Sequence, residues 1–119
     1  MPQKRAPGSL LPLTPATFHV LVAVADGEKH GYAILKEMKR RSGGRVTLTA
    51  GTLYGVIRRL LADGLLVESD ERPDPALDDE RRRYYRLTPF GRDVASAETE
   101  RLAAMVDMAR AKRLFSRSS

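Results

Sequence analysis

The sequence contains no cysteine and no tryptophan, and it has only two histidines. Without cysteine the chain cannot form a disulfide, a thiolate nucleophile or a cysteine-ligated zinc or iron–sulfur site. Two histidines are also too few for a histidine-rich site, so we expect no metal and no cofactor. The longest nearly apolar run, residues 18–25, is far shorter than the roughly 20 residues that cross a bilayer. We therefore expect a cytoplasmic protein that is not embedded in a membrane.

Catalytic motifs are also missing from this chain. An enzyme needs a nucleophile or an acid–base pair set in a pocket, and no such pattern occurs. His19 lies within an apolar helical segment, where a packed side chain is the ordinary interpretation. We expect a protein without enzymatic activity.

Basic residues are abundant and unevenly distributed. The 119 residues, enough for one domain, include 21 lysines and arginines against 15 acidic residues. Residues 1–62 carry ten basic and three acidic side chains, 63–80 carry one and eight, and 81–119 carry ten and four. Sixteen of the basic residues are arginines, whose planar guanidinium can hold a phosphate or a guanine with two hydrogen bonds. Two basic segments separated by an acidic one predict a directed positive face, which favours nucleic acid over a membrane surface as the partner.

Two helices are expected in the first third of the chain. Thr14 and Pro15 are the residue types that begin a helix, and apolar residues follow at helical spacing. Residues 30–41 then form an amphipathic helical pattern. The apolar residues that recur along it are Tyr32, Leu35 and Met38.

A third helix is expected over residues 50–63, after a short β-prone stretch. Its inward stripe consists of Leu53, Ile57 and Leu60. The opposite face carries Gly51, Gly55, Arg58 and Arg59. Glycine costs about 1 kcal/mol relative to alanine in a helix, so glycines on this face indicate close approach of the backbone to another surface. The alternative is that Gly51 belongs to the turn that enters the helix.

Two further β-prone segments, 65–69 and 82–87, are expected to form a hairpin with a long acidic tip. Thr88 and Pro89 repeat the helix start, and the last helix is expected to reach about residue 114. The order of elements is helix, helix, short strand at 46–48, helix and hairpin. This order is that of a winged helix-turn-helix, a mainly α fold with a small β-hairpin (α+β), here with a long C-terminal helix.

Three segments together make the chain resemble the PadR family of transcriptional regulators. They are LTPATFHVLVAVADGEKHGYAILKEM at 13–38, GTLYGVIRRLLADGLL at 51–66 and RRRYYRLTPFGR at 81–92. Their order and spacing are specific, and the single helix after the wing is similar to the family's short subfamily. The resemblance implies a DNA-binding domain followed by a dimerisation helix. The expected parts are a disordered basic arm at 1–9, a winged helix-turn-helix at 10–88, a C-terminal dimerisation helix at 89–115 and a disordered tail at 116–119.

The resemblance assigns DNA contact to the third helix and to the wing. The matching residues are Thr52, Tyr54, Arg58, Arg59, Arg82 and Arg83. The start of the second helix, His30, Gly31 and Tyr32, also matches the family and is interpreted as architectural, with Tyr32 in the core or an interface. Phosphate would repel the acidic wing tip, so we expect DNA to contact the base of the wing strands.

The last helix carries an apolar stripe that is too long for a small winged domain to cover. The residues expected to form a dimer are Val94, Leu102, Met105, Val106 and Ala109. Pairing with a second copy would place two recognition helices roughly 34 Å apart, about one DNA turn. The alternative is a helix folded back on its own domain. Met105 and Met108 could also line a cavity for a small-molecule effector, and regulation without a ligand fits the sequence equally well.

These observations predict a sequence-specific transcriptional regulator that binds double-stranded DNA. We expect a homodimeric repressor that binds a palindromic operator through the third helix and the wing. The alternative is a winged-helix module that mediates protein or RNA interaction without reading duplex DNA.

Overall fold

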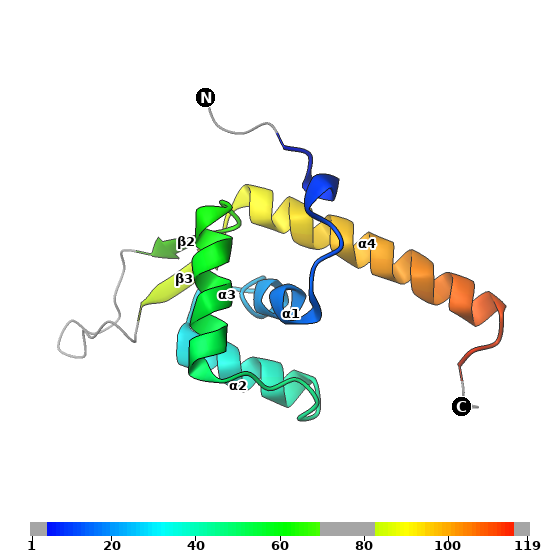
Figure 1. Cartoon of the computed structure of the whole chain (residues 1–119), viewed down its shortest axis with the longest axis horizontal. Helices are drawn as coiled ribbons and strands as arrows, with labels where there is room; N and C mark the ends of the chain where they lie inside the picture. Colours follow the sequence, from blue (N-terminus) through cyan, green and yellow to red (C-terminus); the bar gives the residue numbers. More distant parts are fainter. Residues whose placement is uncertain (1–4, 70–82, 116–119) are drawn as a thin grey trace.

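Four α-helices and a small antiparallel sheet make up the described part of the chain, residues 5–69 and 83–115 of a computed structural model (Figure 1). The helices are the 3₁₀-helix η1 (Pro7–Leu10), α1 (Pro15–Ala23), α2 (Gly31–Arg41), α3 (Ala50–Ala62) and α4 (Pro89–Ala111). The strands are β1 (Lys29–His30), β2 (Leu66–Ser69) and β3 (Tyr84–Leu87). The expected winged-helix fold with a long last helix is confirmed. Within the described residues, no helix has the length and apolar character needed to cross a membrane.

The sheet joins the wing to the start of α2. Its strand order is β1-β3-β2, and β2 pairs antiparallel with β3 so that Glu68 lies opposite Tyr85. On the other edge of β3, His30 of β1 lies opposite Tyr84. The strand expected at 46–48 is wrong, because these residues lie in the loop that leads into α3. A β-prone stretch becomes a strand only where a partner edge is available, and the free edge of β3 is taken by the residues just before α2.

Side chains at the residue before each α-helix accept a hydrogen bond from an amide of the first turn. The capping groups are the hydroxyls of Thr14, Thr49 and Thr88 and the Nδ1 atom of His30. The helix starts expected at Thr14 and Thr88 are therefore confirmed. His30 has a structural role at this position, since its ring nitrogen receives the amide of Ala33 at 3.2 Å.

The core lies where α1, α2, α3, the wing strands and the first turns of α4 meet. The three residues of the expected inward stripe of α3 are all buried. In α2 the buried apolar residues are Ile34 and Met38, whereas Tyr32 is 62% exposed, so it is not in the core and its alternative place in an interface stays a prediction. The inward face of α2 begins one residue earlier, at Gly31, because a side chain there would overlap the ring and hydroxyl of Tyr54 from α3.

The N-terminal segment packs against the body of the molecule. Residues 7–10 form η1, which contacts α4. The Nη2 of Arg5 donates a 2.6 Å hydrogen bond to the carbonyl oxygen of Asp63 at the end of α3, and its guanidinium lies 5.3 Å from the ring centroid of Phe90. A cation at a helix C-terminus and over an aromatic ring is favourable. The expected disordered arm is therefore wrong for residues 5–9, and residues 1–4 lie outside the described part.

A tight joint connects the wing to α4. The hydroxyl of Thr88 donates to the carbonyl oxygen of Gly64 at 2.6 Å, and its amide donates to the carbonyl oxygen of Leu65 at 3.0 Å. Gly91 lies so close to the same carbonyl that a side chain at this position would overlap it. This backbone contact explains the glycine, and it holds the first turn of α4 against the start of β2.

A buried carboxylate holds the middle of α4 to the chain segment before α1. Glu98 is 1% exposed, and its side chain accepts hydrogen bonds from the amide of Leu13 at 3.0 Å and from Arg101 at 2.6 and 2.9 Å. The hydrogen bond from Arg101 holds the pKa of Glu98 below its ordinary value, while burial acts in the opposite direction. Beyond this point α4 extends away from the domain (Figure 1). It ends at Ala111, three residues before the predicted end at 114.

Candidate nucleic-acid interface

The outward face of α3 is open and carries cations. Thr52, Arg58 and Arg59 are exposed as expected. Apart from the adjacent residues and the nearby backbone of α3 itself, no described atom lies within 4 Å of a methyl group built at Gly51 or Gly55, so no other element covers α3 at these positions. An α-helix with an accessible face fits the major groove of duplex DNA, which is about 12 Å wide. DNA contact by these side chains stays a prediction.

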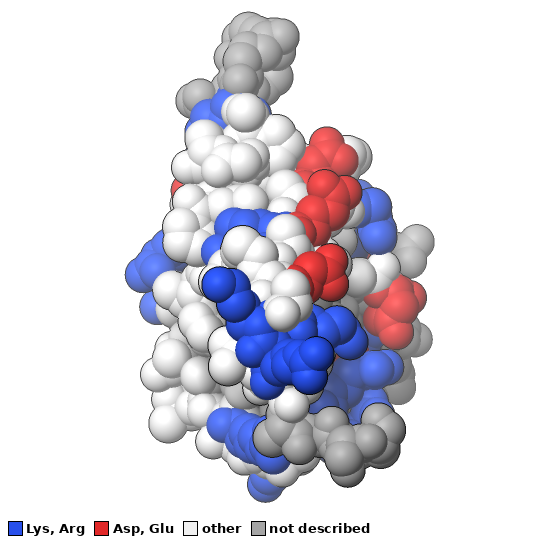
Figure 2. All heavy atoms as spheres, turned by 90° about the vertical axis from the view of Figure 1, so that its right-hand side faces the viewer, with Lys and Arg blue, Asp and Glu red and all other residues white. Residues whose placement is uncertain are grey.

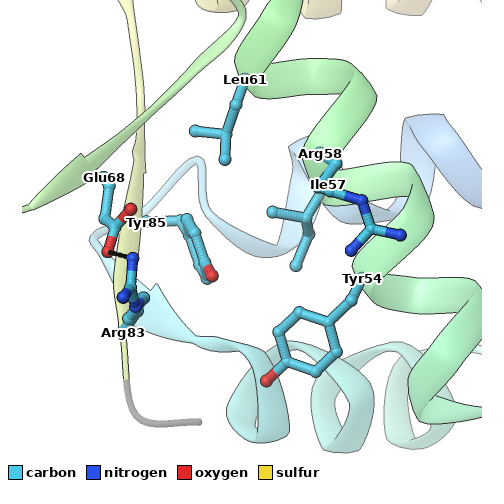
Figure 3. Close-up of a pocket in the computed structure, with 7 residues that line it drawn as sticks. All are labelled: Tyr54, Ile57, Arg58, Leu61, Glu68, Arg83 and Tyr85. Atoms are coloured by element: carbon cyan, nitrogen blue, oxygen red, sulfur yellow. Dashed lines mark hydrogen bonds and ion pairs between the residues drawn. The ribbon is translucent and has the colours of Figure 1, made fainter. Parts of the chain in front are cut away.

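A cleft of about 350 Å³ separates α3 from the wing (Figure 3). The side chains that line it are Tyr54, Ile57, Arg58, Leu61, Glu68, Arg83 and Tyr85. Ile57 from α3 and Tyr85 from β3 point toward each other across it, while Arg83 and Glu68 lie on the wing side. Arg58 from α3 and Arg83, just before β3, both line the cleft.

Two tyrosines give the cleft its shape. Tyr54 points from α3 toward the start of α2 and is half-buried, with its hydroxyl against Gly31. It holds α3 on α2, and its expected contact with DNA stays a prediction. Tyr85 is 5% exposed, and burial raises its pKa above the ordinary value, with the nearby Glu68 carboxylate acting in the same direction. Tyr54 therefore holds α3 against α2, while the buried ring of Tyr85 lies between β3 and α3.

Of the two wing arginines expected to contact DNA, only Arg83 is among the described residues. Arg83 lies on the wing side of the cleft, where its Nη1 is 3.0 Å from the Oε2 of Glu68. Arg82 lies outside the described residues. Arg86, on β3, is exposed. Of the described wing arginines, Arg83 thus lies next to α3, and its contact with DNA stays a prediction.

An exposed row on α2, which the sequence analysis did not assign to a site, adjoins this region. Tyr32, Lys36 and Arg40 are exposed and follow one another at a spacing of four residues. The Nζ of Lys36 lies 5.3 Å from the ring centroid of Tyr32. The ring of His30 stacks on Tyr32 with centroids 6.4 Å apart and meets the ring of Tyr84 edge-on at 5.4 Å. His30 therefore links this row to Tyr84 of the wing. The four-residue spacing of Tyr32, Lys36 and Arg40 in the sequence already indicated that they share one face of the helix.

A buried acid of α2 lies close to cations of β1 and α2. Glu37 is 8% exposed and lies 3.1 Å from the Nε of Arg41 and 3.7 Å from the Nζ of Lys29. Arg40 approaches the same carboxylate only to 4.0 Å, and its side chain is 69% exposed. Arg40 is therefore better placed than Arg41 to meet a partner in solution.

The expected dimerisation residues divide into two groups along α4. Val94 is fully buried in the core of its own chain, so its assignment to a dimer contact is wrong. The cause is that the first turns of α4 pack against α1 within the chain. Leu102 and Ala109 are half-buried, while Met105 and Val106 are 49% and 42% exposed. These four stay predicted contacts.

The far end of α4 is basic. Figure 2 faces the side of the molecule where α4 ends and shows lysine and arginine side chains gathered beside a strip of acidic ones. Arg110 at the end of the helix is exposed, as are the two residues that follow the helix, Lys112 and Arg113. Because these cations lie on a different part of the surface from those of α3 and the wing, a substitution among them can serve as a control for DNA binding.

Comparisons with known proteins agree with this architecture. Residues 20–97 match the model of the transcriptional regulator PadR-like family. Transcriptional regulator Rv3488 of Mycobacterium tuberculosis (strain ATCC 25618 / H37Rv) is 45% identical over 92 residues, which cover 77% of each chain.

Solved structures share the fold. A PadR family transcription regulator from hypervirulent Clostridium difficile R20291 superposes with a TM-score of 0.68 at 18% identity, covering 82% of this chain and 96% of that one. Bacillus subtilis PadR in complex with operator DNA gives a TM-score of 0.60 at 20% identity, covering 76% of this chain and 48% of that one. Since the family model spans most of the winged-helix part and the first turns of α4, the chain belongs to the PadR-like family of transcriptional regulators.

Proposed function

We propose that this regulator is a homodimeric repressor that recognises a palindromic operator in duplex DNA through α3 and the base of the wing. The observation that carries the proposal is the open face of α3 beside a cleft with arginines on both sides. The solved complex of Bacillus subtilis PadR with operator DNA, which has the same fold, supports duplex DNA as the ligand.

The exposed face of α3 is the proposed reading surface. Its 13 residues span roughly 20 Å, which is enough to follow several base pairs in a major groove. Arg58 and Arg59 provide forks that fit the O6 and N7 atoms of guanine or a phosphate. We expect Thr52, near the start of the helix, to contact a base or the DNA backbone. We expect Arg83 at the wing base to contact a phosphate.

The outer half of α4 is the proposed dimer contact. Leu102, Met105, Val106 and Ala109 recur at spacings of three, one and three residues, which places them on one helix face. Large apolar side chains gathered in this way are costly to leave in water, so we infer that a second copy of α4 covers them. Two-fold pairing would then set two α3 helices on successive major grooves of a palindrome.

The test uses DNA from upstream of the protein's own gene. We expect the purified protein to bind this fragment in about 150 mM salt with excess competitor DNA present. The variants Arg58→Ala and Arg59→Ala should weaken binding by about 1–3 kcal/mol where the side chain reads a base. Arg110→Ala, at the far end of α4, is the matched control and should leave affinity nearly unchanged. Full affinity in both α3 variants would exclude α3 as the reading helix.

The oligomeric state is tested separately. Sedimentation at micromolar protein should give the mass of a dimer, and Met105→Glu should shift it toward the monomer by placing a charge in the apolar contact. A wild-type protein that sediments as a monomer at this concentration would contradict the dimer.

A further inference from the structure

An acidic side chain lies inside the cleft that we propose to bind DNA. Glu68 projects from β2, and its side chain is 31% exposed. A carboxylate at this place repels approaching phosphates. If this cleft binds DNA, the Glu68 carboxylate lowers the affinity unless it also makes a contact that favours binding.

The geometry of the wing shows where that carboxylate acts. Glu68 lies directly opposite Tyr85 in the antiparallel pair, and Arg83 comes two residues before Tyr85. Side chains two residues apart on a strand share a face, and diagonal neighbours across a pair are within reach of long side chains. The Nη1 of Arg83 accordingly lies 3.0 Å from the Oε2 of Glu68 (Figure 3). The pair spans the two strands of the wing on the side that faces α3.

We propose that Glu68 is a positioning residue for Arg83, and that it holds the guanidinium at the edge of the cleft ready for a DNA phosphate. This inference rests on the proposed function. An arginine side chain loses much rotamer freedom when it is fixed, and a group fixed before binding avoids that cost at binding. The guanidinium has five N–H donors in a rigid fork, enough to keep the carboxylate contact and meet a phosphate.

The proposal and simple charge repulsion predict opposite signs for one substitution. Glu68→Gln removes a negative charge near the DNA, so repulsion alone predicts tighter binding to every sequence. Loss of positioning predicts weaker binding, because the guanidinium of Arg83 then loses the Glu68 contact that holds it at the edge of the cleft. The change is nearly isosteric and the side chain is partly exposed, so we expect the wing to stay folded, which the urea unfolding midpoint checks.

The experiment is a cycle of four proteins: wild type, Glu68→Gln, Arg83→Ala and the double variant. Affinity for the upstream fragment is measured by fluorescence anisotropy. We expect Glu68→Gln to bind about 3–10-fold more weakly than wild type, and to have no weakening effect when Arg83 is already alanine. Glu100→Gln, an exposed acid on α4, is the control for charge alone and should bind like wild type or slightly tighter. Tighter binding by Glu68→Gln, or equal weakening in both backgrounds, would overturn the proposal.

A second measurement needs no DNA. In the free protein, the Nη1–H group of Arg83, which contacts Glu68, should give a nitrogen–proton NMR signal that exchanges slowly with water, and this exchange should accelerate several-fold in Glu68→Gln. An unchanged exchange rate would overturn the positioning role even where binding is altered. If the wild-type protein failed to bind the upstream fragment, the proposed function would fail, while this signal would still decide whether Glu68 orders Arg83.

Discussion

Replacing Gly55 with alanine separates the stability of α3 from its proposed role. Gly55 lies in the middle of the helix, and apart from the adjacent residues and the nearby backbone of α3 itself, no described atom is within 4 Å of a methyl group built there. Alanine is favoured over glycine by about 1 kcal/mol in a helix interior, so the free energy of unfolding should rise by about 0.5–1 kcal/mol. For a domain of this size the melting temperature should then rise by about 2–8 °C.

The same methyl group should weaken DNA binding. It would stand out from a backbone that we propose lies close to the DNA, and contacts along α3 would have to lengthen to accommodate it. We expect a loss of at least about tenfold, which is about 1.4 kcal/mol. A variant that is more stable yet binds less well cannot be explained by damage to the fold.

Two measurements at one fixed protein concentration decide the matter: urea unfolding followed by circular dichroism, and anisotropy with the upstream fragment. Ser96→Ala, at an exposed position of α4, is the matched control, since it raises helix propensity without touching α3. If Gly55→Ala were more stable and bound DNA as tightly as wild type, the glycine would have no role in close approach. If Gly55→Ala were less stable than wild type, the conclusion that no other element crowds this position would be wrong.

Three further predictions concern the joint, the buried acid and α2. Gly91→Ala should lower the free energy of unfolding by about 2–4 kcal/mol because its methyl group would overlap the backbone before β2, and a normal melting temperature would contradict that contact. The hydrogen bond from Arg101 lowers the pKa of Glu98 in the folded state, so as the pH falls the unfolded chain takes up a proton at Glu98 before the folded chain does. The free energy of unfolding of the wild type should therefore decline below about pH 4. In urea titrations at a series of pH values, Glu98→Gln should show a smaller decline. Substituting both Lys36 and Arg40 with alanine should reduce the magnitude of the slope of log affinity against log salt concentration by about 1–2 and leave the sequence preference unchanged. A slope equal to that of the control variant Arg110→Ala would exclude α2 from phosphate contact.

Features of the fold that depend on neighbouring residues could be predicted from the sequence. The hydroxyl of Thr14 or Thr88 caps an amide three residues ahead, so the signal and its effect lie in the same short segment. The inward stripe of α3 repeats with the helical period, and all three of its members are buried. Local chemistry was therefore sufficient for the order of the helices and for the cations that α3 exposes.

Features that depend on distant partners could not be predicted in this way. The apolar spacing of α2 fits either Tyr32 or Gly31 as the first inward residue, and the fit of Tyr54 from another helix decides for the glycine. Arg5 reaches a carbonyl group 58 residues away, which no local pattern encodes. β1 exists because β3 has a free edge. Within the candidate site, the partnership of Glu68 with Arg83 depends on the strand register in the same way.

The hydrogen bonds of Thr88 and the close contact of Gly91 tie the first turn of α4 to the start of β2, so we expect the wing and α4 to move together. The 23 residues of α4 extend roughly 34 Å, so a tilt of about 5° at one end moves the other by roughly 3 Å. That displacement is close to the 3.4 Å rise between successive bases of duplex DNA. In the proposed dimer, the angle at which two α4 helices cross would therefore set the half-site spacing to within about one base pair. The affinity for operators whose half-sites are one base pair closer together or farther apart would test this dependence directly.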